Sequence, residues 1–151
     1  MKRTQNVASA ADMERLGEGF AAALKPGQMI YFHGALGAGK TTLIRGILRG
    51  LGHGGAVKSP TFTLVEPYAL PARTVYHFDF YRLRAAEELE FLGIRDYLQG
   101  QGICLIEWAE RGAGLLPPPD VDVYIDQVDD GRTVQWVSRT DSGGSLLGGL
   151  T

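Results

Sequence analysis

Apolar residues recur at the spacing of an amphipathic helix in two stretches of the first third of the chain. The first stretch begins at Ser9, which forms a variant of the capping box with Asp12, and it ends before Pro26. Its inner face would carry Met13, Leu16, Phe20 and Leu24. The second stretch covers residues 40–51, and its inner face would carry Leu43, Ile47 and Leu48. Residues 85–92 predict a third, shorter helix.

Short apolar runs predict the strands of a sheet. Residues 29–33 and 103–106 are continuous apolar runs, which are typical of strands covered on both faces. Residues 62–68 and 74–80 flank a turn that contains proline, and they predict an antiparallel pair. Because a glycine-rich loop joins the strand at 29–33 to the helix at 40–51, the chain opens with a strand, loop and helix unit.

The pattern after residue 120 predicts a β-hairpin. Residues 121–126 alternate apolar and polar side chains, a turn follows at 130–131, and residues 133–137 return. Residues 141–151 are rich in Gly, Ser and Leu, so we expect a flexible C-terminal tail. The expected fold class is α/β: a single domain over residues 1–140, with a small mixed β-sheet flanked by helices and a C-terminal β-hairpin.

Composition restricts the classes of function. The 151 residues are 44% hydrophobic and 21% charged, which is ordinary for a globular domain and excludes extensive disorder. The formal net charge of −2 lacks the basic excess of a protein that binds nucleic acid alone, so a partner would have to hold any RNA. Cys104 is the single cysteine, which excludes an intramolecular disulfide and a multi-thiolate metal site. No uncharged apolar stretch reaches about 20 residues, so we expect a soluble cytoplasmic protein without membrane contact.

The most specific motif is Gly34-Ala-Leu-Gly-Ala-Gly-Lys40-Thr41, a complete G-x-x-x-x-G-K-[ST] match between a predicted strand and a predicted helix. In such a P-loop, glycines let consecutive backbone N–H groups converge on phosphate oxygens, and the helix N-terminus adds positive potential. Lys40 would bind the β- and γ-phosphates, and the Thr41 hydroxyl would bind Mg²⁺. The expected nucleotide contacts of this segment are Gly34, Leu36, Gly37, Ala38, Gly39, Lys40, Thr41 and Thr42. The sequence therefore predicts a P-loop NTPase domain.

Two carboxylates are candidates for holding the metal and orienting water, because such groups follow neighbouring strands in P-loop proteins. Glu107 follows an apolar strand, and Asp79 shares one strand face with His77 and Tyr81. The alternatives are a solvated strand end for Asp79 and a surface charge beside Trp108 for Glu107. His77 has no second His or Cys at ligand spacing, which favours an orienting or structural role over metal binding.

Residues 58–63 follow the P-loop helix at the place where small NTPases have a loop that responds to the γ-phosphate. Thr61 is the natural sensor in this loop, and the alternative is that Ser59-Pro60 simply begins a strand. Asn6 is the single asparagine of the chain, so the Asn-Lys-x-Asp motif that reads guanine in GTPases is absent. ATP is therefore the expected nucleotide.

Four motifs occur in one order along the chain. They are the P-loop segment at residues 36–42, Ser59-Pro60-Thr61-Phe62, His77-x-Asp79-x-Tyr81-Arg82-Leu83, and Ile106-Glu107-Trp108. This combination closely resembles the bacterial TsaE (YjeE) family, the small ATPases of tRNA threonylcarbamoyladenosine biosynthesis. The resemblance covers Ser9 to about Arg139, which is nearly the whole chain.

The resemblance implies a single α/β P-loop domain that binds ATP and Mg²⁺ and works with two partners, the catalytic subunit TsaD and its scaffold TsaB. These partners transfer threonylcarbamoyl to an adenosine beside the anticodon of tRNAs that read ANN codons, and tRNA would meet this protein only through them. Carried over residue by residue, the resemblance implies catalytic roles for Lys40, Asp79 and Glu107. Thr41 and Glu107 would be the metal ligands.

The resemblance also implies that Trp108 lies beside the nucleotide, and Arg132 is similar in position to a basic family residue near it. We expect slow ATP hydrolysis by the chain alone and stimulation by the partners, because no arginine can be assigned from sequence as a finger on the γ-phosphate. Two alternatives stay open. A small-molecule kinase would share the P-loop but normally has an arginine-bearing lid, and no such cluster follows Lys58. A nucleotide-binding interaction module without hydrolysis would lack positioned carboxylates.

Overall fold

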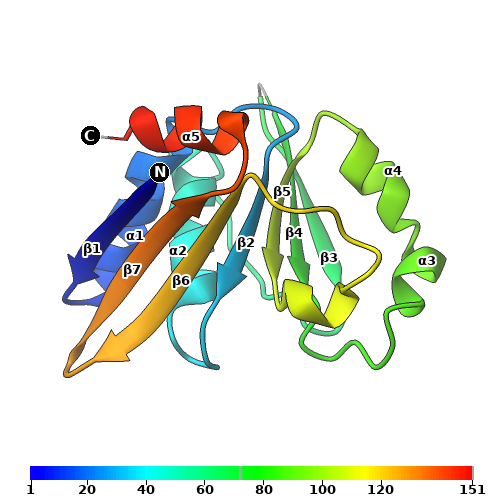
Figure 1. Cartoon of the computed structure of the whole chain (residues 1–151), viewed down its shortest axis with the longest axis horizontal. Coiled ribbons are helices and arrows are strands. Elements are labelled where there is room, and N and C mark those ends of the chain that lie inside the picture. The colour runs from blue at the N-terminus through cyan, green and yellow to red at the C-terminus, as the bar shows by residue number, and fades with distance from the viewer. Residues whose placement is uncertain (72, 151) are drawn as a thin grey trace.

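Four parallel strands form the centre of a seven-stranded mixed sheet in the computed structural model, which describes residues 1–71 and 73–150 (Figure 1). The strand order is β1-β7-β6-β2-β5-β4-β3, and antiparallel strands extend the centre on both sides. The strands are β1 (Lys2–Val7), β2 (Met29–His33), β3 (Val65–Ala69), β4 (Thr74–Asp79), β5 (Ile103–Glu107), β6 (Val121–Val128) and β7 (Gly131–Ser138). The helices are α1 (Ala10–Ala21), α2 (Lys40–Gly50), α3 (Glu88–Leu92), α4 (Ile94–Gln99), the 3-10 helix η1 (Ala109–Gly112) and α5 (Asp141–Gly148).

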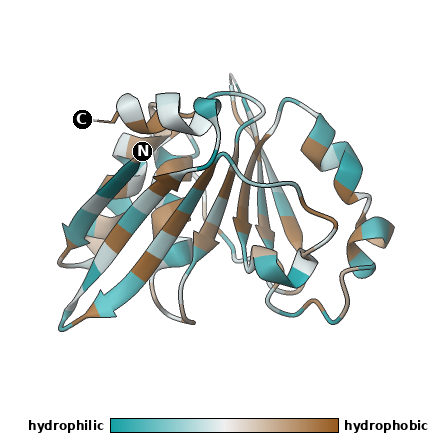
Figure 2. Ribbon diagram, viewed as in Figure 1, coloured by the Kyte–Doolittle hydropathy of each residue, from teal (hydrophilic) through white to brown (hydrophobic). Residues whose placement is uncertain are grey.

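Alternation along the central strands builds one core on each face of the sheet. On β2, Ile30 and Phe32 belong to the core that α1 and α2 cover. Met29 and Tyr31 belong to the core that α3, α4 and η1 cover. In Figure 2 the middle of the sheet is accordingly brown, the colour of hydrophobic residues. The strands β2 and β5 are therefore enclosed from both sides.

Helices α1 and α2 pack with close backbone contact. A Cβ atom at Gly46 would lie 2.0 Å from the carbonyl oxygen of Glu14, and one at Gly17 would lie 2.4 Å from that of Leu43. The two glycines therefore let the helices approach more closely than side chains would permit. This contact holds the P-loop helix α2 firmly against α1.

The structure confirms most of the predicted elements. Predicted segments coincide to within a few residues with the helices α1 and α2, the strands β2, β4 and β5, and the hairpin of β6 and β7. The helix predicted over 85–92 is α3, which begins at Glu88. Strand β1 and helix α4 were not predicted. None of the helices in the described residues has the length and hydropathy to cross a membrane.

The start of β3 differs from the prediction. The strand begins at Val65 rather than at Phe62, because residues 61–63 form a turn. The Leu64 N–H donates to the Pro60 carbonyl oxygen at 2.7 Å, and Leu64 has a φ of +70°. A residue in this left-handed conformation cannot continue a strand, so pairing with β4 starts only after it.

The prediction of a flexible tail over 141–151 is wrong for residues 141–148, which form helix α5, and residue 151 lies outside the described residues. The Thr140 side chain accepts a hydrogen bond from the Gly143 N–H at 3.0 Å and so caps the helix. Leu146 and Leu147 are buried in the core beside α1 and β7. The folded domain therefore continues beyond residue 140.

The carboxyl ends of β2, β4 and β5 meet at one edge of the sheet. Asp79, the last residue of β4, pairs in register with Glu107, the last residue of β5. Glu107 also pairs with Phe32 near the end of β2. The loop that leaves β2 after His33 therefore runs beside both carboxylates.

Candidate functional site

The loop between β2 and α2 has the backbone of a phosphate cradle. Gly37 and Gly39 adopt φ angles of +78° and +118°, which residues with side chains rarely adopt. Gly39 is the N-cap of α2, and no side chain caps this helix, so its first N–H groups are available to an anion. The strand, loop and helix predicted around the motif are thus confirmed.

The Lys40 side chain is folded into the site and is only 5% exposed. Its Nζ donates to the Gly34 carbonyl oxygen at 2.5 Å and lies 3.9 Å from the centroid of the Trp108 ring. Trp108 has a φ of +60°, which is unusual for a bulky residue. Burial lowers the pKa of Lys40 below its ordinary value, and neighbouring carboxylates, Glu107 foremost, oppose this shift. The ammonium group is thus held at the place where a phosphate would enter.

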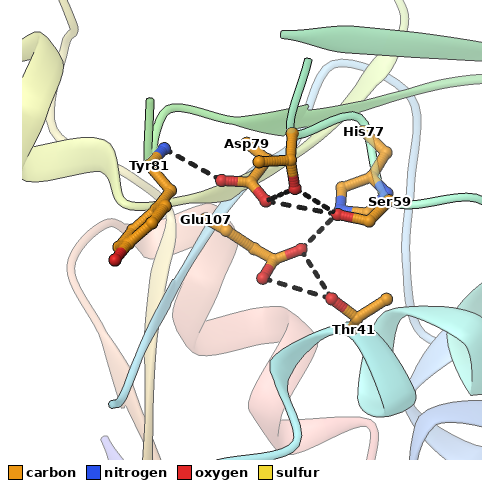
Figure 3. A network of polar contacts seen from close by, with 7 residues as sticks. Thr41, Ser59, His77, Asp79, Tyr81 and Glu107 are labelled. Atoms are coloured by element: carbon orange, nitrogen blue, oxygen red, sulfur yellow. Dashed lines mark hydrogen bonds and ion pairs between the residues drawn. The ribbon is translucent and has the colours of Figure 1, made fainter. Parts of the chain in front are cut away.

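Glu107 is the centre of a buried polar network (Figure 3). Its carboxylate accepts a hydrogen bond from the Thr41 hydroxyl, at 3.2 Å to Oε2 and 3.4 Å to Oε1. His77 Nε2 lies 2.7 Å from the same Oε2 oxygen. Glu107 is 3% exposed, so the interpretation of a surface charge is wrong.

Asp79 connects the end of β4 to the loop that precedes β3 (Figure 3). Its Oδ2 accepts hydrogen bonds from the hydroxyls of Thr61 at 3.0 Å and Ser59 at 3.4 Å. Its Oδ1 accepts a hydrogen bond from the Tyr81 N–H at 2.9 Å. Asp79 is buried, so the alternative of a solvated strand end is also wrong. The predicted sensor residue Thr61 is therefore tied directly to a candidate catalytic carboxylate.

These residues line one cleft of about 560 Å³, a size typical of ligand pockets. Its walls are formed by Leu36, Gly37, Gly39, Lys40, Thr41, Thr42, Ser59, Thr61, Asp79, Tyr81, Arg82, Glu107 and Trp108. A second hollow of about 260 Å³ adjoins the same loop. It shares Gly37, Gly39 and Thr42 with the cleft and is also lined by Val7, Ala8, Ser9, Ala10, Met13, Ala38, Asp130, Gly131 and Arg132.

Most residues predicted for the site therefore lie together. Arg132 reaches the loop from the β6–β7 hairpin, and its Nε donates to the Ala38 carbonyl oxygen at 2.9 Å. Gly34 lines neither hollow, and its contribution is the carbonyl oxygen that binds Lys40.

Sequence reasoning missed several residues of the site. Ser59 and Arg82 lie within motifs that were recognised, so their place in the chain was a usable signal. Ser9 and Met13 line the second hollow because α1 packs beside α2, a tertiary contact that local patterns do not reveal. His77 was assigned only an orienting or structural role, and its contact with Glu107 could not be foreseen.

Thr41 and Glu107 could hold a Mg²⁺ ion. Mg²⁺ takes octahedral oxygen ligands at about 2.0–2.1 Å, so neighbouring ligand oxygens lie roughly 2.9 Å apart. The 3.2 Å between Thr41 Oγ1 and Glu107 Oε2 is close to this spacing. In the part of the chain that the structure describes, no group of three or more His, Cys, Asp or Glu is arranged to hold a metal. In nucleotide sites Mg²⁺ is usually bound by one or two carboxylates together with phosphate oxygens and water.

Comparison with known proteins gives a consistent result. The family model of threonylcarbamoyl adenosine biosynthesis protein TsaE matches residues 7–134. The tRNA threonylcarbamoyladenosine biosynthesis protein TsaE of Haemophilus influenzae is 49% identical over 149 residues, which covers 95% of this chain and 94% of that protein. Its counterpart in Bacillus subtilis is 38% identical over 137 residues, with 90% and 84% covered.

A solved structure shows the same architecture. The crystal structure of YdiB from Bacillus subtilis superposes with a TM-score of 0.82 at 29% sequence identity, and it covers 98% of this chain and 93% of that one. The fold is that of a P-loop NTPase, as the sequence predicted. The protein belongs to the TsaE family of tRNA threonylcarbamoyladenosine biosynthesis.

Proposed function

We propose that this protein binds ATP with Mg²⁺ and hydrolyses it to sustain multiple-turnover formation of threonylcarbamoyladenosine in tRNAs that read ANN codons. The observation that carries the proposal is the convergence of Lys40, Thr41, Asp79 and Glu107 on one cleft. A P-loop that only binds nucleotide needs the first two residues, whereas hydrolysis also needs groups that hold the metal and orient water. All four groups are present at the same edge of the sheet.

The two adjoining hollows support a nucleoside triphosphate as the ligand. The cleft beside Lys40 and Glu107 would take the β- and γ-phosphates. The second hollow shares Gly37 and Gly39 with the cleft and has an apolar wall at Met13, so it would take the base. The single asparagine, Asn6, does not begin the Asn-Lys-x-Asp motif that reads guanine, and this favours adenine as the base.

Each residue of the cleft has a role in this proposal. Lys40 binds phosphate oxygens, while Thr41 and Glu107 hold the metal. The bound metal supplies positive charge that neutralises the phosphates. Asp79 orients the attacking water, and its bond to Thr61 links that role to the loop preceding β3. Because ATP and ADP differ in the γ-phosphate that Thr61 would meet, this loop could report which nucleotide is bound.

The proposed partners are TsaD and TsaB, and tRNA is contacted only through them. The net charge of −2 supports this division of work, because a free-standing tRNA binder needs a basic surface. A partner would also supply the charge that accelerates hydrolysis, as arginine fingers do in other P-loop proteins.

The test is single-turnover hydrolysis of γ-labelled ATP by the protein alone and with the TsaB and TsaD pair. We expect slow release of inorganic phosphate by the protein alone, and acceleration by the pair of up to about 10³–10⁵ if a finger is supplied. Tight binding without phosphate release in either condition would favour an interaction module. Transfer of the label to a small molecule from a cell extract would favour a kinase.

A further inference from the structure

His77 lies on the same face of β4 as Asp79 and is completely buried. Val75 precedes it on that face of β4, and Leu105 lies beside it on β5. Both residues belong to the hydrophobic core. Its Nε2 makes one contact, at 2.7 Å to Oε2 of Glu107 (Figure 3). An imidazole therefore stands at a position whose other neighbours are apolar.

The direction of this hydrogen bond follows from the chemistry of the two groups. A carboxylate that binds Mg²⁺ only accepts hydrogen bonds, so in the proposed metal-binding role of Glu107 the proton lies on Nε2 and His77 is the donor. The other ring nitrogen, Nδ1, is buried and has no hydrogen-bond partner among the described residues. A buried nitrogen without a partner costs free energy, and an apolar side chain would fill the same space without that cost. Packing alone therefore does not explain a histidine here.

The contact restrains Glu107 at the atom that matters for metal binding. Oε2 is the oxygen nearest to the Thr41 hydroxyl, and His77 contacts this oxygen as well. With its oxygen fixed between two donors, the Glu107 carboxylate cannot rotate freely about its terminal bond. Hydrogen bonds of this kind orient metal ligands, and their loss typically weakens metal affinity by about 10- to 100-fold.

We infer that His77 is a positioning residue, whose Nε2–H holds the Glu107 carboxylate in the orientation that binds Mg²⁺ together with Thr41. The inference rests on the proposed function, since it assumes that these two residues hold the metal. His77 itself touches neither the nucleotide nor the metal.

The experiment measures ADP affinity by calorimetry in excess EDTA and in saturating Mg²⁺, and the ratio of the two dissociation constants reports the Mg²⁺ effect. His77→Leu removes the donor. We expect the ratio of the dissociation constant in EDTA to that in Mg²⁺ to fall by about 10-fold or more, or to reach one if the wild-type ratio is smaller than that. The affinity in EDTA should be unchanged. His77→Gln keeps an N–H near the position of Nε2 and should retain most of the ratio. Val75→Ala, on the same face of β4, is the control for a loss of core packing.

The outcomes separate the inference from the proposed function. A wild-type protein whose ADP affinity does not respond to Mg²⁺ would contradict the proposed metal role. If the ADP affinity of the wild-type protein responds to Mg²⁺, two results would overturn the inference and leave the proposed function standing. One is the same response in His77→Leu, and the other is an equal loss of the response in His77→Leu and His77→Gln.

A second measurement does not depend on the folding of the leucine variant. Nitrogen-15 NMR of the imidazoles distinguishes the two tautomers, and His77→Gln identifies the His77 signals among the three histidines. The inference requires the proton of wild-type His77 on Nε2. An Nε2 without a proton, with the proton on Nδ1 instead, would overturn it.

Discussion

Removal of the Lys40 ammonium is the most informative perturbation of the proposed phosphate site. Lys40→Ala should leave the fold intact, because alanine is favourable in the first turn of α2 and the buried charge contributes little to stability. A charge-assisted hydrogen bond contributes about 1.5–3 kcal/mol, which corresponds to a roughly 10- to 150-fold change in Kd. Lys40 Nζ also binds the Gly34 carbonyl oxygen and the Trp108 ring, and a phosphate would compete with these contacts. We therefore expect a loss of about 10- to 30-fold in ADP affinity.

Calorimetry is the suitable assay for this change. Trp108 fluorescence would be a poor reporter, because the substitution alters the surroundings of that ring directly. Lys25→Ala is a matched control, since it removes the same charge from an exposed position outside both hollows. ATP hydrolysis should fall further, by about 10²–10³, if Lys40 contacts the transition state. A folded Lys40→Ala protein with the same ADP affinity as Lys25→Ala would refute the phosphate-binding role.

The same residue predicts a pH dependence of nucleotide binding. Only the protonated amine attracts phosphate, so affinity should be constant below the pKa of Lys40 in the free protein and should fall as the pH rises through it. Burial lowers this pKa below the ordinary lysine value of 10.5, so the fall should begin at a lower pH than an ordinary lysine would give. Cys104 does not interfere, because burial raises its pKa to about 12. ADP titrations at rising alkaline pH measure the dependence, and an affinity that begins to fall no earlier than an ordinary lysine would give would contradict it.

Three further predictions follow from the site and the packing. Glu107→Gln should mainly weaken Mg²⁺-dependent binding, whereas Asp79→Asn should lower turnover more than nucleotide affinity; wild-type hydrolysis by both variants with the partners present would show that the carboxylates are wrongly assigned. Gly46→Ala should lower the free energy of unfolding in urea by about 1–3 kcal/mol or more, because its Cβ would clash with the backbone of α1. Gly19→Ala is the control: it lies on α1 with open space around it, and it should raise the free energy of unfolding by roughly 0.5–1 kcal/mol. Leu147→Ala should lower the free energy of unfolding by about 2–5 kcal/mol. An unchanged urea midpoint would instead support the prediction of a flexible tail.

The P-loop and its two carboxylates could be predicted because their signals are local. The glycine spacing from Gly34 to Lys40 specifies the loop directly. Asp79 and Glu107 end strands whose sequence patterns are clear, and parallel pairing brings such ends to one edge of the sheet. The distances between these groups depend on the register of β4 and β5, which the sequence pattern leaves open.

The elements that were missed owe their stability to distant contacts. Strand β1 alternates exposed and half-buried residues, so it has little apolar signal, and its pairing with β7 supplies its order. Gly143 reads as a sign of flexibility, yet a Cβ there would lie 1.9 Å from the Asp120 carbonyl oxygen. This glycine permits a close contact between α5 and the segment before β6. Composition alone cannot distinguish that use of glycine from a mobile tail.

The measurement that tests the central claim most directly is multiple-turnover transfer of threonylcarbamoyl to tRNA by purified TsaD and TsaB. The reaction is run with the wild-type protein, with Lys40→Ala, or with neither, at equal ATP and Mg²⁺. We predict that the wild-type protein sustains many products per complex, and that the other two reactions stall after few cycles. Equal yields in all three reactions would contradict the account, even if the protein bound ATP.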